Sequence, residues 1–416
     1  MDYGQDANPS ALLRLVKEHR KLGLSSAKAA LLLLAAFLVA SFLFTGVGNA
    51  RSLRNFAQQA PNVISFLTRS AFESPEITWA QVTSTITEKL QQKIQTRLEK
   101  ARRYHESLSN SIHLQNPTTP RLLFLQGSGG RLGNFLFCTA SLIGIARRNQ
   151  YTPIYLINDE RTTLFTGLNI EILNRTDALR LTRQTTLPEI SEKGAAIYSD
   201  YIADFPLQHG NQSVILSGFL QSFKYFHAFR DEIRTALTFT EAILTQAVQS
   251  INDSLNALHG ENNGAMYRRV PRLVGIHVRR GDITAADDLK NFGFLGATIH
   301  YVMNTIRLVR RLHRNSGTVF LVVTDDVDYC LNVLQLRTFK DVAVVSSKDN
   351  PPAVDLAVLS LTETVIMTVG TFGWWGGYLS ESEEVYYYRK WPKKKSRLAK
   401  LVERRDYFLP TWHGWV

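Results

Sequence analysis

Apolar runs that alternate with helical patterns fill the chain from about residue 120 to its C-terminus. Short buried-strand patterns occur at 121–126, 151–157, 213–218, 273–278, 319–324, 342–345 and 364–369. Helical periodicity separates several of them, at 132–148, 301–312 and 355–361. Strands that alternate with helices predict an α/β architecture with parallel sheets. The length of this region predicts two Rossmann-like domains facing each other, at 120–270 and 271–416.

The N-terminal part of the chain begins with a candidate membrane anchor. Residues 29–47 carry no charge, and a helix of that length matches a hydrocarbon core of about 30 Å. Lys and Arg are more frequent before this run than after it. Residues 1–28 are therefore predicted to form a cytoplasmic tail, and the residues after the anchor to lie on the opposite side of the membrane. A cleaved signal peptide ending near Ala50 and a buried soluble helix are the alternatives.

Residues 48–119 are predicted to form a partly helical stem. Ser74-Pro75-Glu76 is typical of a helix start, with a capping Ser and Pro at the first helical position. Apolar residues then recur at intervals of four, at Val82, Ile86, Leu90, Ile94 and Leu98. Such a stripe winds around a helix and is not a heptad seam. It either mediates self-association, giving a homodimer through the stem, or packs on the domains that follow.

The formal charge of +12 does not indicate a nucleic-acid partner, because Lys and Arg are scattered and no zinc-finger or RNP-like motif accompanies them. Nine of them gather in 389–405, which predicts a solvated basic tail, with contact to a membrane or an anionic acceptor as the alternative. Cys138 and Cys330 are either two buried free thiols or one bridge. The chain also carries three N-glycosylation sequons, at Asn174, Asn211 and Asn252.

The most informative segment is Val274-Gly-Ile-His-Val-Arg-Arg-Gly-Asp282, in which a buried strand ends in a cationic cluster. Side chains two apart on a strand share a face, so His277 and Arg279 are expected to point the same way, with Arg280 opposite or already in the loop. Ligands of open α/β sheets bind beyond the carboxyl ends of the strands, and a guanidinium fork suits a diphosphate. An Arg–Asp salt bridge that closes the strand is the alternative.

Three further segments carry candidate chemistry. Gly127–Asn134 and Gly370–Gly373 each lead into a helical pattern, where bare backbone amides suit a phosphate, although a plain tight turn explains either one. Asp325-Asp326 follows a strand, where we favour hydrogen bonds to a guanine edge; Asp326-Val-Asp328 also matches a short metal-binding signature formally. The aromatic run 219–226 is explained by core packing or, less simply, by a sugar-stacking platform.

Five motifs, taken in order over about 120–416, resemble the galactoside α-1,2-fucosyltransferase family. They are Gly-Gly-Arg-Leu-Gly-Asn134, Gly218-Phe-Leu-Gln-Ser, His277-Val-Arg-Arg-Gly-Asp282, Val369-Gly-Thr-Phe-Gly-Trp-Trp375 and Phe408-Leu-Pro-Thr-Trp412. The resemblance implies an inverting GT-B-type enzyme that uses GDP-β-L-fucose and needs no metal or other cofactor. The third motif is shared with the α-1,6-fucosyltransferases of N-glycan cores, so the donor is better defined than the linkage.

The family pattern gives the candidate donor-site residues their roles. By this resemblance Arg279 pairs with the β-phosphate, and His277 together with Asp325 or Asp326 holds the guanine or ribose. The remaining contacts are expected from residues flanking the diphosphate and the fucose, namely Arg280, Thr371, Phe372 and, from the other domain, Asn134. Asp282 is a candidate catalytic base, although orienting Arg279 or Arg280 is the simpler role.

The resemblance also implies a Golgi type II membrane protein whose lumenal domain fucosylates a β-galactoside, a terminal galactose of a glycan. Asp325-Asp326 and Gly376-Gly377 depart from the animal galactoside enzymes and leave the acceptor open. Two alternatives remain. One is the same donor with another acceptor, either N-glycan core N-acetylglucosamine or a protein hydroxyl; the other is a catalytically silent, membrane-anchored glycan- or nucleotide-binding protein.

Overall fold

The computed structural model describes residues 76–112, 121–127, 129–261, 266–281, 283, 287–347 and 350–416. The predicted cytoplasmic tail, the anchor at 29–47 and residues 48–75 and 113–119 of the predicted stem lie outside these residues. Asp282 lies outside them as well. Within the described ranges no helix is both long and apolar enough to cross a membrane.

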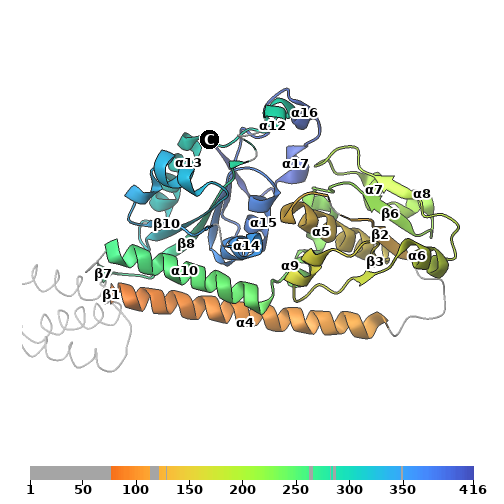
Figure 1. The fold of residues 1–416 in the computed structure, drawn as a ribbon, viewed down its shortest axis with the longest axis horizontal. Coiled ribbons are helices and arrows are strands. Elements are labelled where there is room, and N and C mark those ends of the chain that lie inside the picture. Colours follow the sequence, from red (N-terminus) through yellow and green to blue (C-terminus); the bar gives the residue numbers. More distant parts are fainter. Residues whose placement is uncertain are drawn as a thin grey trace, which may run out of the picture. The chain divides into compact units, whose positions relative to one another are not determined.

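Two all-parallel sheets form the framework of one compact unit, Thr78–Ala265 and Val270–Val416 (Figure 1). The first has the strand order β4-β3-β2-β6-β5, with β2 Leu122–Leu125, β3 Thr152–Tyr155, β4 Glu171–Ile172, β5 Glu189–Ser191 and β6 Val214–Ser217. The second has the order β10-β9-β8-β11-β12-β13, with β8 Arg272–Val278, β9 Thr318–Thr324, β10 Val342–Val344, β11 Thr364–Met367, β12 Val385–Tyr388 and β13 His413–Trp415. The predicted α/β class is therefore confirmed.

Helices connect the strands and cover the sheets, as parallel strands require. The longer ones are α5 Leu132–Asn149, α6 Arg175–Thr182, α10 Glu241–Glu261, α13 Ile299–Leu312, α14 Pro352–Leu361 and α15 Thr371–Leu379. Shorter ones are α7 Asp200–Ala203, α8 Pro206–His209, α9 Arg230–Ala236, α12 Asp287–Phe292, α16 Arg397–Lys400 and α17 Arg404–Tyr407. A separate two-stranded pair consists of β1 Ile77–Thr78 and β7 Met266–Tyr267. Covered on both faces, β8 and β9 are buried almost throughout, which explains their continuous apolar sequence.

The stem helix α4 (Trp79–Ile112) starts later than the sequence predicted. Thr78 and Gln81 form a reciprocal capping box: the Thr78 amide donates to the Gln81 side chain at 2.8 Å, and the Gln81 amide donates to the Thr78 hydroxyl at 3.3 Å. These two bonds satisfy amide groups that the first turn leaves free, so they fix the start after Thr78. The Ser74-Pro75 start is therefore wrong, and the signal it overlooked is Thr-x-x-Gln.

The apolar stripe of α4 packs on the same chain. Val82, Ile86, Leu90, Ile94 and Leu98 are all buried, and α4 contacts α10 and α9. Of the two alternatives left open by the sequence, packing on the following domains is the one the structure shows for this stripe. Figure 1 shows α4 running alongside α10 and on past α9.

The basic run at 389–405 connects β12 to β13 and is therefore not a tail, but every Lys and Arg in it except Arg404 is exposed, so its solvated character is confirmed. The Arg404 guanidinium donates to the carbonyls of Arg389 and Trp391, both at 2.6 Å. The chain then contacts the first half of the unit, the part built on the first sheet, where Asp406 pairs with Lys224 at 2.6 Å. This contact precedes β13 in the chain, and nothing in the local charge pattern indicates it.

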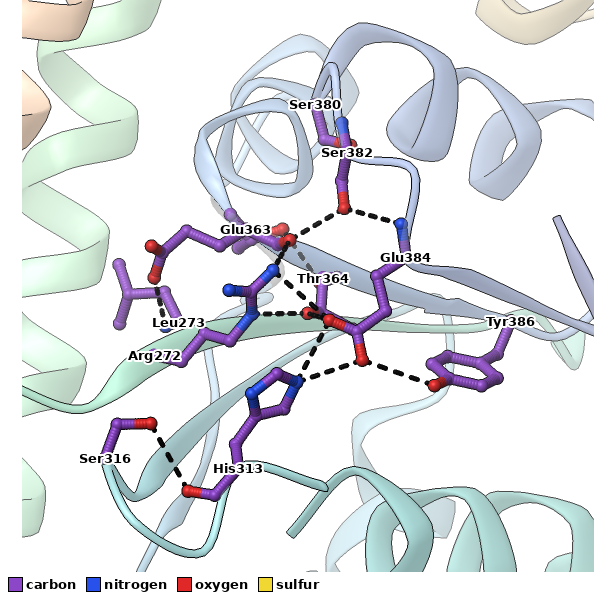
Figure 2. Close-up of polar contacts among 11 residues, drawn as sticks. Arg272, Leu273, His313, Ser316, Glu363, Thr364, Ser380, Ser382, Glu384 and Tyr386 are labelled. Atoms are coloured by element: carbon purple, nitrogen blue, oxygen red, sulfur yellow. Dashed lines mark hydrogen bonds and ion pairs between the residues drawn. The ribbon is translucent and has the colours of Figure 1, made fainter. Parts of the chain in front are cut away.

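A polar network ties together the amino ends of β8, β11 and β12 (Figure 2). Glu384 accepts hydrogen bonds from His313 at 2.9 Å and from Thr364 at 2.9 Å, and it pairs with Arg272 at 3.2 Å. Because Arg272 begins β8 and the His277–Arg280 cluster follows its other end, this network lies at the opposite edge of the sheet from the cluster. We assign it to stability of the sheet.

Candidate functional site

His277 lies near the carboxyl end of β8 and is buried, with 5% of its surface exposed. Its ring packs against Phe372 with centroids 5.4 Å apart, and its Nδ1 has no hydrogen-bond partner among the described residues. A Cβ on Gly373 would lie 2.3 Å from that nitrogen, so only glycine fits there. Burial, together with the charge of Arg279, lowers the pKa of His277 to about 3. His277 is therefore neutral across the physiological range.

Arg279 follows two residues later and points to the same side. Its amide donates to the Thr368 hydroxyl at 2.9 Å, which fixes the backbone where the strand ends. Its guanidinium lies against Gly370, where a Cβ would come within 2.5 Å of Nη1 and where φ is +89°. Both His277 and Arg279 thus reach the turn that begins α15. The expectation that they share a face is confirmed.

Arg280 points away from these two residues. Its guanidinium carbon lies 3.6 Å from the centroid of the Tyr329 ring, and its Nε lies 3.5 Å from a carboxylate oxygen of Asp326. Its amide donates to Asp325 at 2.7 Å. Asp325 and Asp326 therefore position the segment after β8. Tyr329 was missed by the sequence reasoning, since its contact with Arg280 joins residues 49 apart in the chain.

In the Asp326-Val-Asp328 signature, the carboxylate of Asp326 already has protein partners. Asp326 accepts from the Tyr329 amide at 3.0 Å in addition to pairing with Arg280. Among the described residues, no group of three or more His, Cys, Asp or Glu side chains is arranged to hold a metal ion. The use of Asp325 and Asp326 on a guanine edge stays a prediction, and so does the role of Asp282.

The helices α5 and α15 lie side by side (Figure 1), and contacts of Gly133 and Asn134 with Thr371 join their amino termini. The Thr371 hydroxyl donates to the Asn134 side-chain oxygen at 3.0 Å, joining residues from the two sheets' halves. A Cβ on Gly133 would lie 2.5 Å from Thr371 Oγ1 and 2.8 Å from the Phe372 amide nitrogen, so glycine permits the close approach. Each helix start carries partial positive charge, and two of them next to Arg279 form a strong site for an anion.

A turn from the first sheet completes this junction. Gln221, after β6, donates through Nε2 to the same Asn134 oxygen at 3.2 Å. Glu192, after β5, accepts hydrogen bonds from the amides of Phe219 and Leu220. Sequence reasoning missed Gln221 and Glu192 as site residues, although Gln221 lies within one of the five motifs. Of the predicted residues, the structure brings Asn134, His277, Arg279, Thr371 and Phe372 together, with Arg280, Asp325 and Asp326 as a second group on the other side of the strand end.

The family model for Glycosyl transferase family 11 matches residues 86–415. The chain belongs to this family. The rat galactoside alpha-(1,2)-fucosyltransferase 1 is 25% identical over 307 residues, which cover 72% of this chain and 76% of the rat protein. The enzyme of the same name from Lagothrix lagotricha is 26% identical over 290 residues, covering 68% and 72%. The resemblance seen in the motifs of this family 11 chain is thereby confirmed.

Solved structures that resemble this family 11 chain include POFUT1 in complex with GDP, at 11% identity and a TM-score of 0.36, covering 64% of this chain and 98% of that one. The fucosyltransferase NodZ from Bradyrhizobium is 15% identical with a TM-score of 0.38, covering 62% of this chain and 93% of that one.

Both cysteines of the family 11 chain are free and buried. Of the two alternatives, the pair of buried thiols is the one the structure shows.

Proposed function

We propose that this chain transfers L-fucose from GDP-β-L-fucose to the O2 hydroxyl of a β-galactoside, with inversion at the anomeric carbon. The observation that supports this proposal most directly is the anion site formed by Arg279 and the adjoining amino termini of α5 and α15. A diphosphate suits it in charge and in hydrogen bonding, since planar guanidinium donors and backbone amides both match phosphate oxygens. The family and the names of its relatives support fucose as the sugar and galactose as the acceptor.

In this proposal the acceptor oxygen forms a bond to the anomeric carbon of fucose as the bond from that carbon to the β-phosphate oxygen breaks. GDP leaves with the bonding electron pair, and the acceptor proton passes to a base or to the leaving group. Arg279, with the amides at the start of α15, stabilises the charge that develops on the diphosphate. No divalent metal is needed for that step in this proposal, and fixed positive groups of this kind lower a barrier by about 3–4 kcal/mol each.

The other roles follow from the placement of each side chain. His277 is neutral and buried against Phe372, with its Nδ1 facing Gly373, and is proposed to hold the guanine or ribose. Thr371 and Asn134 lie where the two halves meet and contact the fucose or the diphosphate. Asp325 and Asp326 hold Arg280 and present their remaining oxygens to the guanine. Asp282 is proposed to orient Arg279 or Arg280, with a role as base as the alternative.

We also propose that residues 29–47 anchor the chain in the Golgi membrane as a type II protein with a lumenal catalytic domain, which makes it a two-domain GT-B-type enzyme on a stem. Asn174 and Asn211 are exposed and can carry a glycan. Asn252 is half-buried, and its Oδ1 accepts a hydrogen bond from Thr87 of α4 at 2.8 Å, so a glycan on its Nδ2 would lie beside α4. Glycosylation at the first two sites and not at Asn252 would agree with this topology.

An acceptor array tests the function directly. The full-length chain is incubated with radiolabelled GDP-fucose and β-galactosides, an N-glycan core with terminal N-acetylglucosamine, or peptides with Ser and Thr. Methylation analysis then gives the linkage, and fucose on O2 of galactose is the expected product. Fucose on the core or on a peptide would assign the other acceptor class. Saturable GDP binding without any product would favour a silent binding protein.

Arg279→Lys tests the role of the guanidinium. Lysine keeps the charge but lacks the planar fork, so turnover should fall by about 100- to 1000-fold, the usual effect of removing one charge-stabilising donor. Arg307→Lys on the exposed face of α13 is the matched control and should keep full turnover. Turnover near the wild-type value in Arg279→Lys would remove Arg279 from the diphosphate site.

A further inference from the structure

The first sheet presents an exposed aromatic ring beside the glycine loop. Phe219 follows β6 and exposes 38% of its surface, whereas Phe223, Tyr225 and Phe226 of the same aromatic run are buried. A Cβ on Gly129 would lie 3.7 Å from Phe219 Cε1, so the ring lies next to bare backbone of the loop. Core packing thus accounts for the rest of the run but not for Phe219. The ring lies at the carboxyl edge of a parallel sheet, where ligands bind.

A second apolar side chain flanks the same loop. Ile157, after β3, exposes 53% of its surface, and its Cδ1 lies 3.7 Å from the Cβ position of Gly127. Gly127 and Gly129 carry no side chains that would cover this surface. Phe219 and Ile157 thus each place exposed apolar surface beside a glycine of the same loop. A sugar ring with one apolar face is a ligand of the right character for such a surface.

The turn that carries Phe219 is held in a conformation that costs free energy. Leu220 has φ +50°, a left-handed conformation that costs a non-glycine residue on the order of 1–2 kcal/mol. Gly218 has φ +122°, and Glu192 occupies the space that a side chain there would need. The two carboxylate oxygens of Glu192 accept from the Phe219 and Leu220 amides, and Ser141 of α5 donates to the Leu220 carbonyl at 3.0 Å. The Phe219 backbone is therefore fixed while its ring stays exposed.

The turn is also continuous with the proposed donor site. Its last residue, Gln221, donates to the side-chain oxygen of Asn134, which also accepts from Thr371 at the start of α15. One oxygen thus connects the Phe219 turn to the helix start that we assign to the diphosphate. A sugar lying on Phe219 would be positioned relative to the donor through these three side chains.

We propose that Phe219 is the acceptor platform, on which the apolar face of the terminal galactose stacks, and that Glu192 is the positioning residue of its turn. This inference rests on the proposed function. Galactose suits the platform because its axial C4 hydroxyl leaves the C–H groups at C3, C4 and C5 together on the opposite face. An aromatic ring binds such a face by burial and by dispersion contacts.

The test measures phenyl β-galactoside as acceptor and as ligand with the full-length chain. Phe219→Ala should raise the acceptor KM on the order of tenfold, which corresponds to about 1.4 kcal/mol. It should leave the turnover at saturation and the KM for GDP-fucose unchanged, whereas Phe219→Tyr keeps the wild-type KM. Leu207→Ala is the matched control, since Leu207 is 83% exposed on α8, which precedes β6 and lies away from its carboxyl end.

Glu192→Gln tests the positioning role. The glutamine amide group would face one of the two backbone amides as a second donor, so the turn loses a hydrogen bond and the acceptor KM should rise while turnover at saturation is kept. Glu189→Gln, exposed on β5, is the control. A role in general stability alone would lower the unfolding midpoint without separating the acceptor KM from turnover.

Direct binding separates this inference from the proposed function. Saturation-transfer NMR of phenyl β-galactoside, recorded with GDP present, should show binding that Phe219→Ala weakens and Phe219→Tyr retains. If the wild type transfers fucose but Phe219→Ala keeps both its acceptor KM and its binding, the platform is refuted and the function stands. If no sugar is transferred but binding depends on Phe219, the function is refuted and the platform stands. Absence of any galactoside binding in the wild type refutes the platform.

Discussion

Gly133→Ala is expected to inactivate the enzyme although it replaces a helical glycine with the best helix former. A Cβ at this position would lie 2.5 Å from Thr371 Oγ1, 2.7 Å from the Thr371 carbonyl carbon and 2.8 Å from the Phe372 amide nitrogen. An ordinary contact between such atoms is about 3.5 Å or longer. The starts of α5 and α15 must therefore separate by roughly 1 Å to relieve the closest of these contacts. A displacement close to 1 Å among groups that position a substrate costs about 100-fold in rate.

The effect on stability is expected to be small, because two terms oppose each other. Alanine gains about 1 kcal/mol over glycine in a helix, while overpacking a buried contact costs about 1–3 kcal/mol. The separation also lengthens the hydrogen bond from Thr371 to Asn134, now 3.0 Å. GDP binding, which we assign mainly to the second half, should change less than turnover.

The assay compares turnover at saturating substrates, GDP affinity and the unfolding midpoint of Gly133→Ala with those of the wild type. Leu207→Ala is the control, because Leu207 is 83% exposed on α8, outside the two helix starts. Turnover of Gly133→Ala within threefold of the wild type would show that the close approach of α5 and α15 does not position the substrates. Loss of folding in place of turnover would show that the stability estimate is wrong.

Three further predictions address the sheet edge, the acid response and the metal. Glu384→Gln should lower the free energy of unfolding by about 1–3 kcal/mol, because it leaves Arg272 and His313 without their carboxylate, and should not change GDP affinity. Below pH 6.5 the unfolded chain protonates His277 while the native chain, with a pKa of about 3, does not, so stability present above pH 6.5 is lost as the pH falls. Between pH 7 and pH 5 this amounts to about 2 kcal/mol, and the loss should be smaller in His277→Asn but unchanged in the exposed His300→Gln control, as measured by denaturant titration. Transfer should survive EDTA; a strong loss that manganese restores would return Asp326-Val-Asp328 to the site.

Much of the framework could be predicted from the sequence because it depends on local patterns. The buried run of β8 marks a strand covered on both faces, and period-two geometry places His277 and Arg279 together. The glycine loop before α5 and the Gly370 turn before α15 indicated two helix starts with open backbone. The contact between these two starts depends on the tertiary structure. The sequence shows the glycines that permit it but not the residues that these glycines contact.

The parts that could not be predicted depend on contacts between distant residues. Glu192 reads as an ordinary charged residue after a short strand, and only the folded chain brings it to the Phe219 and Leu220 amides. Arg280 stacks on Tyr329 because these residues follow β8 and β9, and these two strands are neighbours in the second sheet. The return of 402–406 to the first half likewise leaves no local signal. The start of α4 is different, since its Thr78–Gln81 capping box is a local signal that the sequence does contain.

The Asn134 side-chain oxygen explains why neither half of the chain holds a complete site. It accepts from Thr371 on the donor side and from Gln221 on the turn proposed for the acceptor. Two helix starts that face each other repel through their partial positive charges unless an anion lies between them. We therefore expect an anionic donor to stabilise the junction at which Asn134 accepts both hydrogen bonds. Because the same oxygen reaches the Phe219 turn, binding of the donor also fixes the surface on which the acceptor sugar is proposed to lie.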